Sequence, residues 1–145
     1  GPAYKGIPLV CSASVALSNK DINVPYSFNR KEIKDHGEGG KIIGSPIKGK
    51  VLILDDVISA GTSINESYNL IKNSGAQIVG VIVAIDRQEK GEDSLSATQE
   101  ITKKYSIPVF SLINLEDIIH YLETKNDFKN ELELIKIYQN TYGVI

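Results

Sequence analysis

An excess of charge of one sign, a pair of cysteines and a long apolar run are all missing from this 145-residue sequence. The formal net charge of -2 gives no reason to expect nucleic acid or an anionic membrane surface as a partner. Cys11 is the only cysteine, so an internal disulfide is impossible, and its apolar neighbours favour a buried, inert thiol. No apolar stretch approaches the roughly 20 residues of a membrane span, and no signal peptide is visible. These absences predict a cytoplasmic protein with neither nucleic-acid nor membrane partners.

Two nucleotide-binding motifs are missing as well. Neither the phosphate loop G-x-x-x-x-G-K-[ST] nor the dinucleotide fingerprint G-x-G-x-x-G occurs in the chain, so ATP and dinucleotides are poor candidates for its ligand. Internal repeats and low-complexity segments are also absent. With 41% hydrophobic and 23% charged residues, the composition fits one α/β domain over residues 1–145.

The most informative stretch that is present covers residues 51–63. Residues 51–54, Val-Leu-Ile-Leu, predict a fully buried strand of the parallel kind, and Asp55 and Asp56 end it. The small residues Ser-Ala-Gly-Thr-Ser at 59–63 then form a turn that opens a helix. Backbone amides in such a turn and the positive end of the helix dipole bind anions, so this stretch predicts a phosphate site.

Strands and helices are expected to alternate along the rest of the chain. Ser63 and Glu66 have the spacing of a capping box, and Gly75 stands where a left-handed helix end belongs. Further strands are predicted over residues 78–85 and 107–113, with a helix over about 95–105 between them. Asn114 is expected to cap the next helix and Asp127 the last one. This order predicts a central, mostly parallel sheet flanked by helices.

The last predicted helix carries an apolar stripe that favours core or dimer packing over a ligand role. The stripe consists of Phe128, Leu132, Ile135, Tyr138 and Tyr142. His120 lies within the preceding helix and is interpreted as structural or solvent-facing.

The pair of aspartates favours recognition of hydroxyl groups beside the phosphate. Two carboxylates repel a phosphate group but accept hydrogen bonds from vicinal hydroxyls, so Asp55 and Asp56 fit ribose 5-phosphate. Taken alone, such a pair is more often a turn cap and a solvated strand end. The flanking sequence favours the ligand-binding interpretation.

Residues 30–41 predict a mobile loop that closes over an anion. The segment has four basic and three acidic residues, one histidine and three glycines, and Ile33 is its only aliphatic residue. It cannot hold itself in place by burying apolar surface, and its glycines supply backbone freedom. Arg30, Lys31, Lys34 and His36 would attract a phosphorylated ligand. The alternative is an ordinary solvated turn.

Four segments resemble the type I phosphoribosyltransferases, and among them the orotate phosphoribosyltransferases. They are residues 1–8 (Gly-Pro-Ala-Tyr-Lys-Gly-Ile-Pro), residues 28–40, residues 55–63 and the dipeptide Asp86-Arg87. The resemblance implies an α/β fold of the type I phosphoribosyltransferase kind, with a mobile catalytic loop at about residues 29–41. It covers the first 87 residues, and the remainder is compatible with it.

The activity implied by the resemblance is a glycosyl transfer in pyrimidine (UMP) biosynthesis. Ribose 5-phosphate passes from phosphoribosyl pyrophosphate to orotate with Mg2+ present, giving orotidine 5'-monophosphate and pyrophosphate. The implied catalytic residues are Lys34, Arg30, Lys31 and His36. The implied substrate-binding residues are Tyr4, Lys5, Asp55, Asp56, Val57, Ile58, Ser59, Ala60, Gly61, Thr62, Ser63 and Arg87.

Metal and base recognition follow from the same resemblance. Mg2+ is expected to ride on the substrate, with Asp55 or Asp56 touching it directly or through water. Arg87 is the candidate partner of the orotate carboxylate, because a guanidinium can bind a carboxylate with two parallel hydrogen bonds. The alternative is a surface pair of Arg87 with Asp86 or Glu89.

The resemblance further implies a homodimer whose loops cross to the neighbouring site. The sequence has no methionine and opens inside a family motif, so an N-terminal hood segment of the family is expected to be missing from it. Two alternatives stay open: transfer to a purine base, and a non-catalytic regulator that senses phosphoribosyl pyrophosphate.

Overall fold

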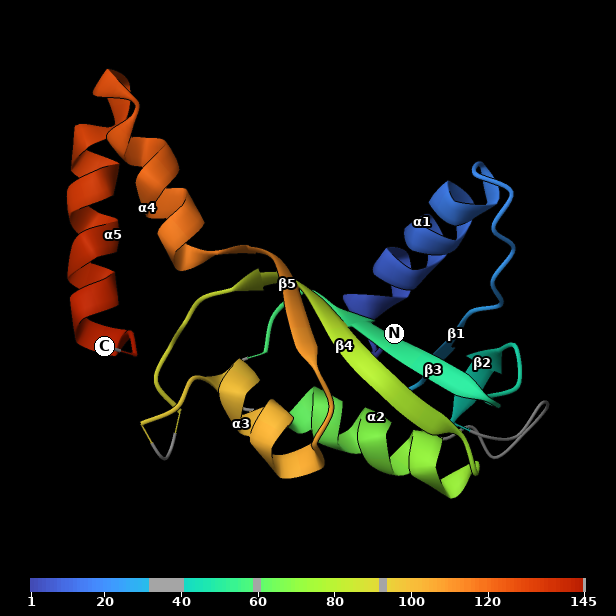
Figure 1. Ribbon diagram of the computed structural model, residues 1–145. Helices are drawn as coiled ribbons and strands as arrows, with labels where there is room; N and C mark the ends of the chain where they lie inside the picture. Colours follow the sequence, from blue (N-terminus) through green and yellow to red (C-terminus); the bar gives the residue numbers. More distant parts are fainter. Residues whose placement is uncertain (32–40, 59–60, 92–93, 145) are drawn as a thin grey trace. The chain divides into compact units, whose positions relative to one another are not determined.

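The computed structural model describes residues 1–31, 41–58, 61–91 and 94–144 (Figure 1). Its residues fall into two compact units. The first unit comprises residues 1–56 and 62–81, and the second comprises residues 57–61 and 82–145. The prediction of one domain over residues 1–145 stays a prediction.

The first unit is built around one strand, with two helices packed on it. Its elements are α1 (Gly6–Ser18), β1 (Ser27–Asn29), β2 (Ile42–Gly44), β3 (Lys50–Asp55), α2 (Thr62–Asn73) and the first half of β4 (Gln77–Asp86). Both α1 and α2 contact β3, and α1 also contacts β1. Strands β1 and β2 form an antiparallel pair, with Asn29 opposite Ile42. Ile64 of α2 is almost fully buried, so the apolar face of this helix helps to form the core.

The second unit contains the remaining helices and the last strand. Its elements are the second half of β4, α3 (Ala97–Tyr105), β5 (Val109–Asn114), α4 (Leu115–Glu123), a 3-10 turn at Asn126–Phe128 and α5 (Lys129–Tyr142). Helices α3 and α4 contact β5, while α4 and α5 pack together as a helical hairpin. Lys136 donates a hydrogen bond to Glu123 across this hairpin at 2.6 Å. No helix in the described part of the chain is both long and apolar enough to span a lipid bilayer.

Strand β4 is the centre of the three-stranded parallel sheet, whose order is β3-β4-β5 (Figure 1). Val81 and Val83 of β4 are completely buried, as expected for a strand with a neighbour on each side. The expectation of a parallel sheet with helices packed on its strands is confirmed. Strand β3 is less buried than predicted, because Leu52 is 42% exposed.

Two predicted helix ends are confirmed by their hydrogen bonds. The Asn114 side chain accepts from the backbone N–H of Asp117 at 2.9 Å, and the Asp117 carboxylate accepts from the N–H of Asn114 at 2.8 Å. This reciprocal pair is a capping box. Gly75 follows α2 with φ +76°, and its N–H donates to the carbonyl of Lys72 at 3.0 Å. That left-handed conformation is one that glycine adopts without steric cost.

Two other predicted helix starts are wrong. Helix α2 already begins at Thr62, so Ser63 lies inside the first turn and does not stand at the cap position. Helix α5 begins after Phe128, and no side chain caps it. Asp127 instead lies within the 3-10 turn that leads straight into this helix, so it never takes the flanking position that a cap requires.

Candidate active site

The two aspartates at the carboxyl end of β3 lie in different environments. Asp55 is buried, with 7% of its surface exposed, and its Oδ1 accepts a hydrogen bond from the backbone N–H of Asp56 at 2.9 Å. The Asp56 side chain is 30% exposed. Asp55 is the last residue of β3 and shares the buried face of the strand with Ile53, two positions earlier, whereas Asp56 follows the strand. Asp56 is therefore the carboxylate that a ligand can reach from solvent.

Lys5 is the partner of Asp56. Its Nζ donates to Oδ2 of Asp56 at 2.8 Å, and its side chain is 76% exposed. Lys5 directly precedes α1, and the packing of α1 on β3 brings residues 51 positions apart into contact. An exposed pair of this kind is held weakly. The lysine can therefore turn toward an anionic ligand at little cost in stability.

Lys31 connects the start of the chain to the predicted catalytic loop, and Arg30 pairs with Lys41 at the base of that loop. Lys31 Nζ lies 5.0 Å from the centre of the Tyr4 ring, a cation-π geometry. The N–H of Arg30 donates to the carbonyl of Lys41 at 2.8 Å, which extends the β1-β2 pairing to the base of the loop. Within the first unit, Lys31 thus lies beside Tyr4, and Asp56 contacts Lys5, the residue after Tyr4. Lys34 and His36 lie outside the described residues.

The predicted phosphate loop is described in part. Ser59 and Ala60 lie outside the described residues, Val57 is half-buried and Ile58 is buried. Gly61 has φ +66°, and Thr62 and Ser63, both exposed, form the first turn of the 12-residue helix α2. The first backbone N–H groups of a helix have no partner within it and carry its positive dipole end. The start of α2 therefore has the chemistry that an anion requires.

Arg87 follows β4 in the second unit, and there it adopts the alternative arrangement considered from the sequence. Its Nη2 lies 2.8 Å from Oε2 of Glu89, and its side chain is 38% exposed. Among the described residues, its Nε is buried without a hydrogen-bond partner. Glu89 in turn accepts a hydrogen bond from the Tyr138 hydroxyl. The sequence pattern places Tyr138 in an apolar stripe and gives no signal for this contact, because nothing local joins positions 49 residues apart.

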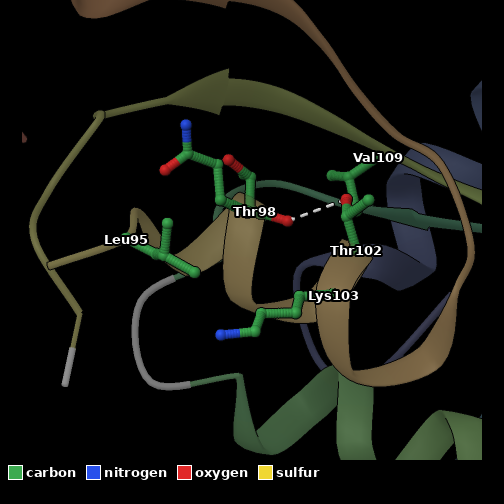
Figure 2. Close-up of a pocket in the computed structure, with 6 residues that line it drawn as sticks. Leu95, Thr98, Thr102, Lys103 and Val109 are labelled. Carbon is green, nitrogen blue, oxygen red and sulfur yellow. Dashed lines mark hydrogen bonds between the residues drawn. The ribbon is translucent and has the colours of Figure 1, made fainter. Parts of the chain in front are cut away.

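The hollow drawn in Figure 2 lies elsewhere in the second unit. It has a volume of about 460 Å³ and is lined by residues of α3, the residue before its cap and the start of β5: Leu95, Thr98, Gln99, Thr102, Lys103 and Val109. Within it, the Thr102 hydroxyl donates to the Thr98 carbonyl at 3.0 Å. None of the predicted site residues lines this hollow, so it is not the predicted substrate site.

The donor set at the aspartates fits Mg2+ only in part. Among the described residues, no group of three or more His, Cys, Asp or Glu side chains could hold a metal ion. Asp55 and Asp56 supply carboxylate oxygens, which are the ligands this hard cation prefers. Most of its coordination shell would therefore come from water and from a phosphorylated ligand.

Burial of Asp55 predicts a stabilising substitution. Desolvation raises the pKa of this carboxyl from its ordinary 3.8 to about 6, although the hydrogen bond from the Asp56 backbone opposes the shift. The folded state thus holds the proton more tightly than the unfolded chain. The stability that the protonated Asp55 carboxyl contributes is fully present below pH 3.8 and is lost as the pH rises through about 6. Asp55→Asn should raise the free energy of unfolding at pH 7.5 by about 1–3 kcal/mol.

Urea unfolding followed by circular dichroism at pH 7.5 and pH 5 measures this effect. The gain from Asp55→Asn at pH 5 should be about half that at pH 7.5, because the folded protein is already largely protonated there. Asp56→Asn, at the more exposed position, is the matched control and should change stability little at either pH. A gain that does not depend on pH would contradict burial of the charge as its cause.

Known proteins share the sequence and the fold of this chain. The family model described as "Phosphoribosyl transferase domain" matches residues 1–111. The chain is 55% identical over 143 residues to an orotate phosphoribosyltransferase of Nitrosomonas europaea, and the match covers 99% of the chain and 63% of that protein. For the enzyme of the same name from Marinobacter nauticus, the identity is 52% over 144 residues, with coverage of 99% and 68%.

A solved structure agrees with these relatives. The crystal structure of orotate phosphoribosyltransferase from Francisella tularensis matches with a TM-score of 0.81 and 42% identity, covering 99% of this chain and 66% of that one. The chain thus spans about two thirds of the length of its relatives. From the matched domain, the identity of 52–55% in alignments that cover 99% of the chain, and the shared fold, we conclude that the chain belongs to the phosphoribosyltransferase family, among the orotate phosphoribosyltransferases.

Proposed function

We propose that the protein containing this chain is a Mg2+-dependent orotate phosphoribosyltransferase of cytoplasmic pyrimidine biosynthesis. It transfers ribose 5-phosphate from phosphoribosyl pyrophosphate to a ring nitrogen of orotate. The observation that carries the proposal is the Asp55-Asp56 pair at the end of β3, directly before a small-residue turn and α2, in a chain at least 50% identical to proteins of that name.

The first unit supplies groups for both ends of the sugar phosphate. Asp56 accepts hydrogen bonds from the ribose hydroxyls, since it is the accessible carboxylate of the pair. The N–H groups of Thr62 and Ser63, at the positive end of α2, bind the 5-phosphate. The sequence also assigns Ser59, Ala60 and Gly61 to the phosphate-binding turn, of which Ser59 and Ala60 lie outside the described residues.

Departure of pyrophosphate is the step at which the basic residues act. The bond between C1 and the pyrophosphate oxygen breaks with its electron pair leaving on oxygen. The new bond forms from C1 to the orotate nitrogen, and the proton of that nitrogen passes to solvent. Negative charge therefore builds up on the leaving group, and positive charge on the sugar. Lys5 and Lys31 approach the same end of the first unit, and with Arg30, Lys34 and His36 they stabilise the leaving group.

Mg2+ bound together with phosphoribosyl pyrophosphate would neutralise phosphate charge and polarise the leaving group. Asp55 and Asp56 are the residues that would contact it, directly or through water. Arg87 is proposed to bind the orotate carboxylate, and Ser59 to contact the base through its hydroxyl. Binding by Arg87 needs donors not used by Glu89, and a guanidinium has five.

An absorbance assay for orotate consumption tests the proposal. The full-length protein should consume orotate with phosphoribosyl pyrophosphate and Mg2+, release pyrophosphate and leave adenine and hypoxanthine unchanged. Consumption of a purine with orotate untouched would assign a purine-base transferase instead. Binding of phosphoribosyl pyrophosphate without pyrophosphate release would indicate a regulator.

A homodimer with loops that cross between subunits is part of the proposal, and it predicts recovery of activity in hybrids. Lys34→Ala and Asp56→Ala subunits, each nearly inactive alone, should regain activity when mixed, since one site of each hybrid dimer combines an intact loop with an intact aspartate. Random mixing should restore about a quarter of the native activity. Absence of recovery, with hybrids verified by native mass spectrometry, would show that each site is self-contained.

A further inference from the structure

Arg87 is the first member of a chain of three polar side chains in the second unit. Its Nη2 lies 2.8 Å from Glu89 Oε2, and the other carboxylate oxygen of Glu89 accepts a hydrogen bond from the Tyr138 hydroxyl. Tyr138 belongs to α5, and its ring packs 5.1 Å from that of Tyr142. The guanidinium after β4 is therefore tied through Glu89 to a helix near the end of the chain.

The backbone around Arg87 is held from two further directions. The Gln88 side chain accepts a hydrogen bond from the N–H of Glu116, at the start of α4, at 3.1 Å. The Gln88 carbonyl accepts from the N–H of Val144 at 2.9 Å, and the N–H of Lys90 donates to the carbonyl of Tyr142 at 2.7 Å. Both ends of the helical hairpin thus hold this segment, and Gln88 itself adopts φ +51°. A backbone fixed in this way leaves mainly side-chain torsions to set the direction of the guanidinium.

Glu89 restricts those torsions without occupying all of the N–H groups of Arg87. It contacts one terminal nitrogen, Nε has no partner among the described residues, and 38% of the Arg87 side chain is exposed. The contact from Tyr138 holds the Glu89 carboxylate in turn, so it cannot easily swing over the remaining N–H groups. A cation oriented before its ligand arrives loses less side-chain entropy on binding.

We propose that Glu89 and Tyr138 are positioning residues that orient Arg87 toward the carboxylate of the acceptor base. The inference rests on the proposed function, in which Arg87 binds that carboxylate. It makes affinity for the base depend on helix α5, whereas affinity for phosphoribosyl pyrophosphate and turnover at saturation depend on other residues.

Steady-state kinetics of conservative variants of the full-length protein test this dependence. Tyr138→Phe should raise the KM for orotate about fivefold, and Glu89→Gln about tenfold, which correspond to the loss of roughly one hydrogen bond in a charged network. The kcat and the KM for phosphoribosyl pyrophosphate should stay within about twofold. In an Arg87→Ala background, which itself raises the KM for orotate, Tyr138→Phe should add nothing.

Two control variants separate positioning from loosening of the hairpin. Tyr142→Phe removes a neighbouring hydroxyl of α5, and Lys136→Gln breaks the 2.6 Å contact with Glu123. Neither should change the KM for orotate. If both controls raise it as much as Tyr138→Phe does, the effect belongs to hairpin packing and the inference is wrong.

The remaining outcomes distinguish the inference from the proposed function. If Arg87→Ala raises the KM for orotate while Tyr138→Phe and Glu89→Gln leave it unchanged, positioning is overturned and the proposed function stands. If the unsubstituted protein does not turn over orotate, the proposed function is overturned and the inference with it. Circular dichroism of each variant verifies that its fold is retained.

Discussion

Asp56→Ala should lower kcat/KM for phosphoribosyl pyrophosphate by about a hundredfold or more. Under the proposed function, Asp56 accepts hydrogen bonds from ribose hydroxyls, and a bond to a charged group is worth about 1.5–3 kcal/mol. Loss of two such bonds weakens transition-state binding by about 3 kcal/mol, and each 1.4 kcal/mol is a factor of about ten. Stability should change little, because the ion pair of Asp56 is made with a lysine side chain that is 76% exposed.

Steady-state kinetics and thermal unfolding together measure this effect. Asp56→Asn keeps the shape and one acceptor oxygen but removes the charge, so its loss should be smaller, about tenfold. Lys5→Gln removes the lysine of the ion pair and leaves the Asp56 carboxylate in place. Comparing its kinetics with those of Asp56→Ala shows how much of the fall in kcat/KM is due to the ion pair. Unchanged kinetics for Asp56→Ala would remove this residue from the substrate site.

Lys34→Ala should lower kcat by about a hundredfold to a thousandfold, the size seen when one group that stabilises developing charge is removed. Lys34 belongs to the catalytic loop predicted from the sequence and lies outside the described residues. Its charge matters most as pyrophosphate departs, so the KM values should change much less than kcat.

A presteady-state measurement of pyrophosphate release isolates this step. Lys41→Ala is the matched control, since Lys41 is an exposed lysine at the base of the same loop, where its carbonyl accepts from the Arg30 N–H. It should retain most of the activity. Equal turnover of Lys34→Ala and the unsubstituted protein would exclude Lys34 from catalysis.

Local patterns predicted those parts of the fold that local physics determines. The spacing of Asn114 and Asp117 indicated a capping box, and the structure shows both of its hydrogen bonds. Gly75 was expected to end a helix in a left-handed conformation and does so. Each signal depends on residues within one turn of one another, and at these two positions the packing of the helices agrees with it.

The helix starts at Ser63 and Asp127 show where the same reasoning fails. Both residues have side chains suited to capping. However, α2 begins one residue before Ser63, and Asp127 lies within a 3-10 turn. The position at which a helix begins depends on how its apolar face packs against its neighbours. In α2, Ile64 on that face is buried in the core. A cap contributes only about 1 kcal/mol and yields to that packing.

By itself, the sequence determined the family, the alternation of strands and helices, and the acidic pair before a small-residue turn, because each is written in consecutive residues. Only the tertiary structure decided that Asp55 is buried while Asp56 pairs with Lys5. It also decided that Arg87 pairs with Glu89, which accepts a hydrogen bond from Tyr138. Burial, and with it the raised pKa of Asp55, depends on what packs around a residue. Contacts across 51 and 49 positions exist only after the chain has folded.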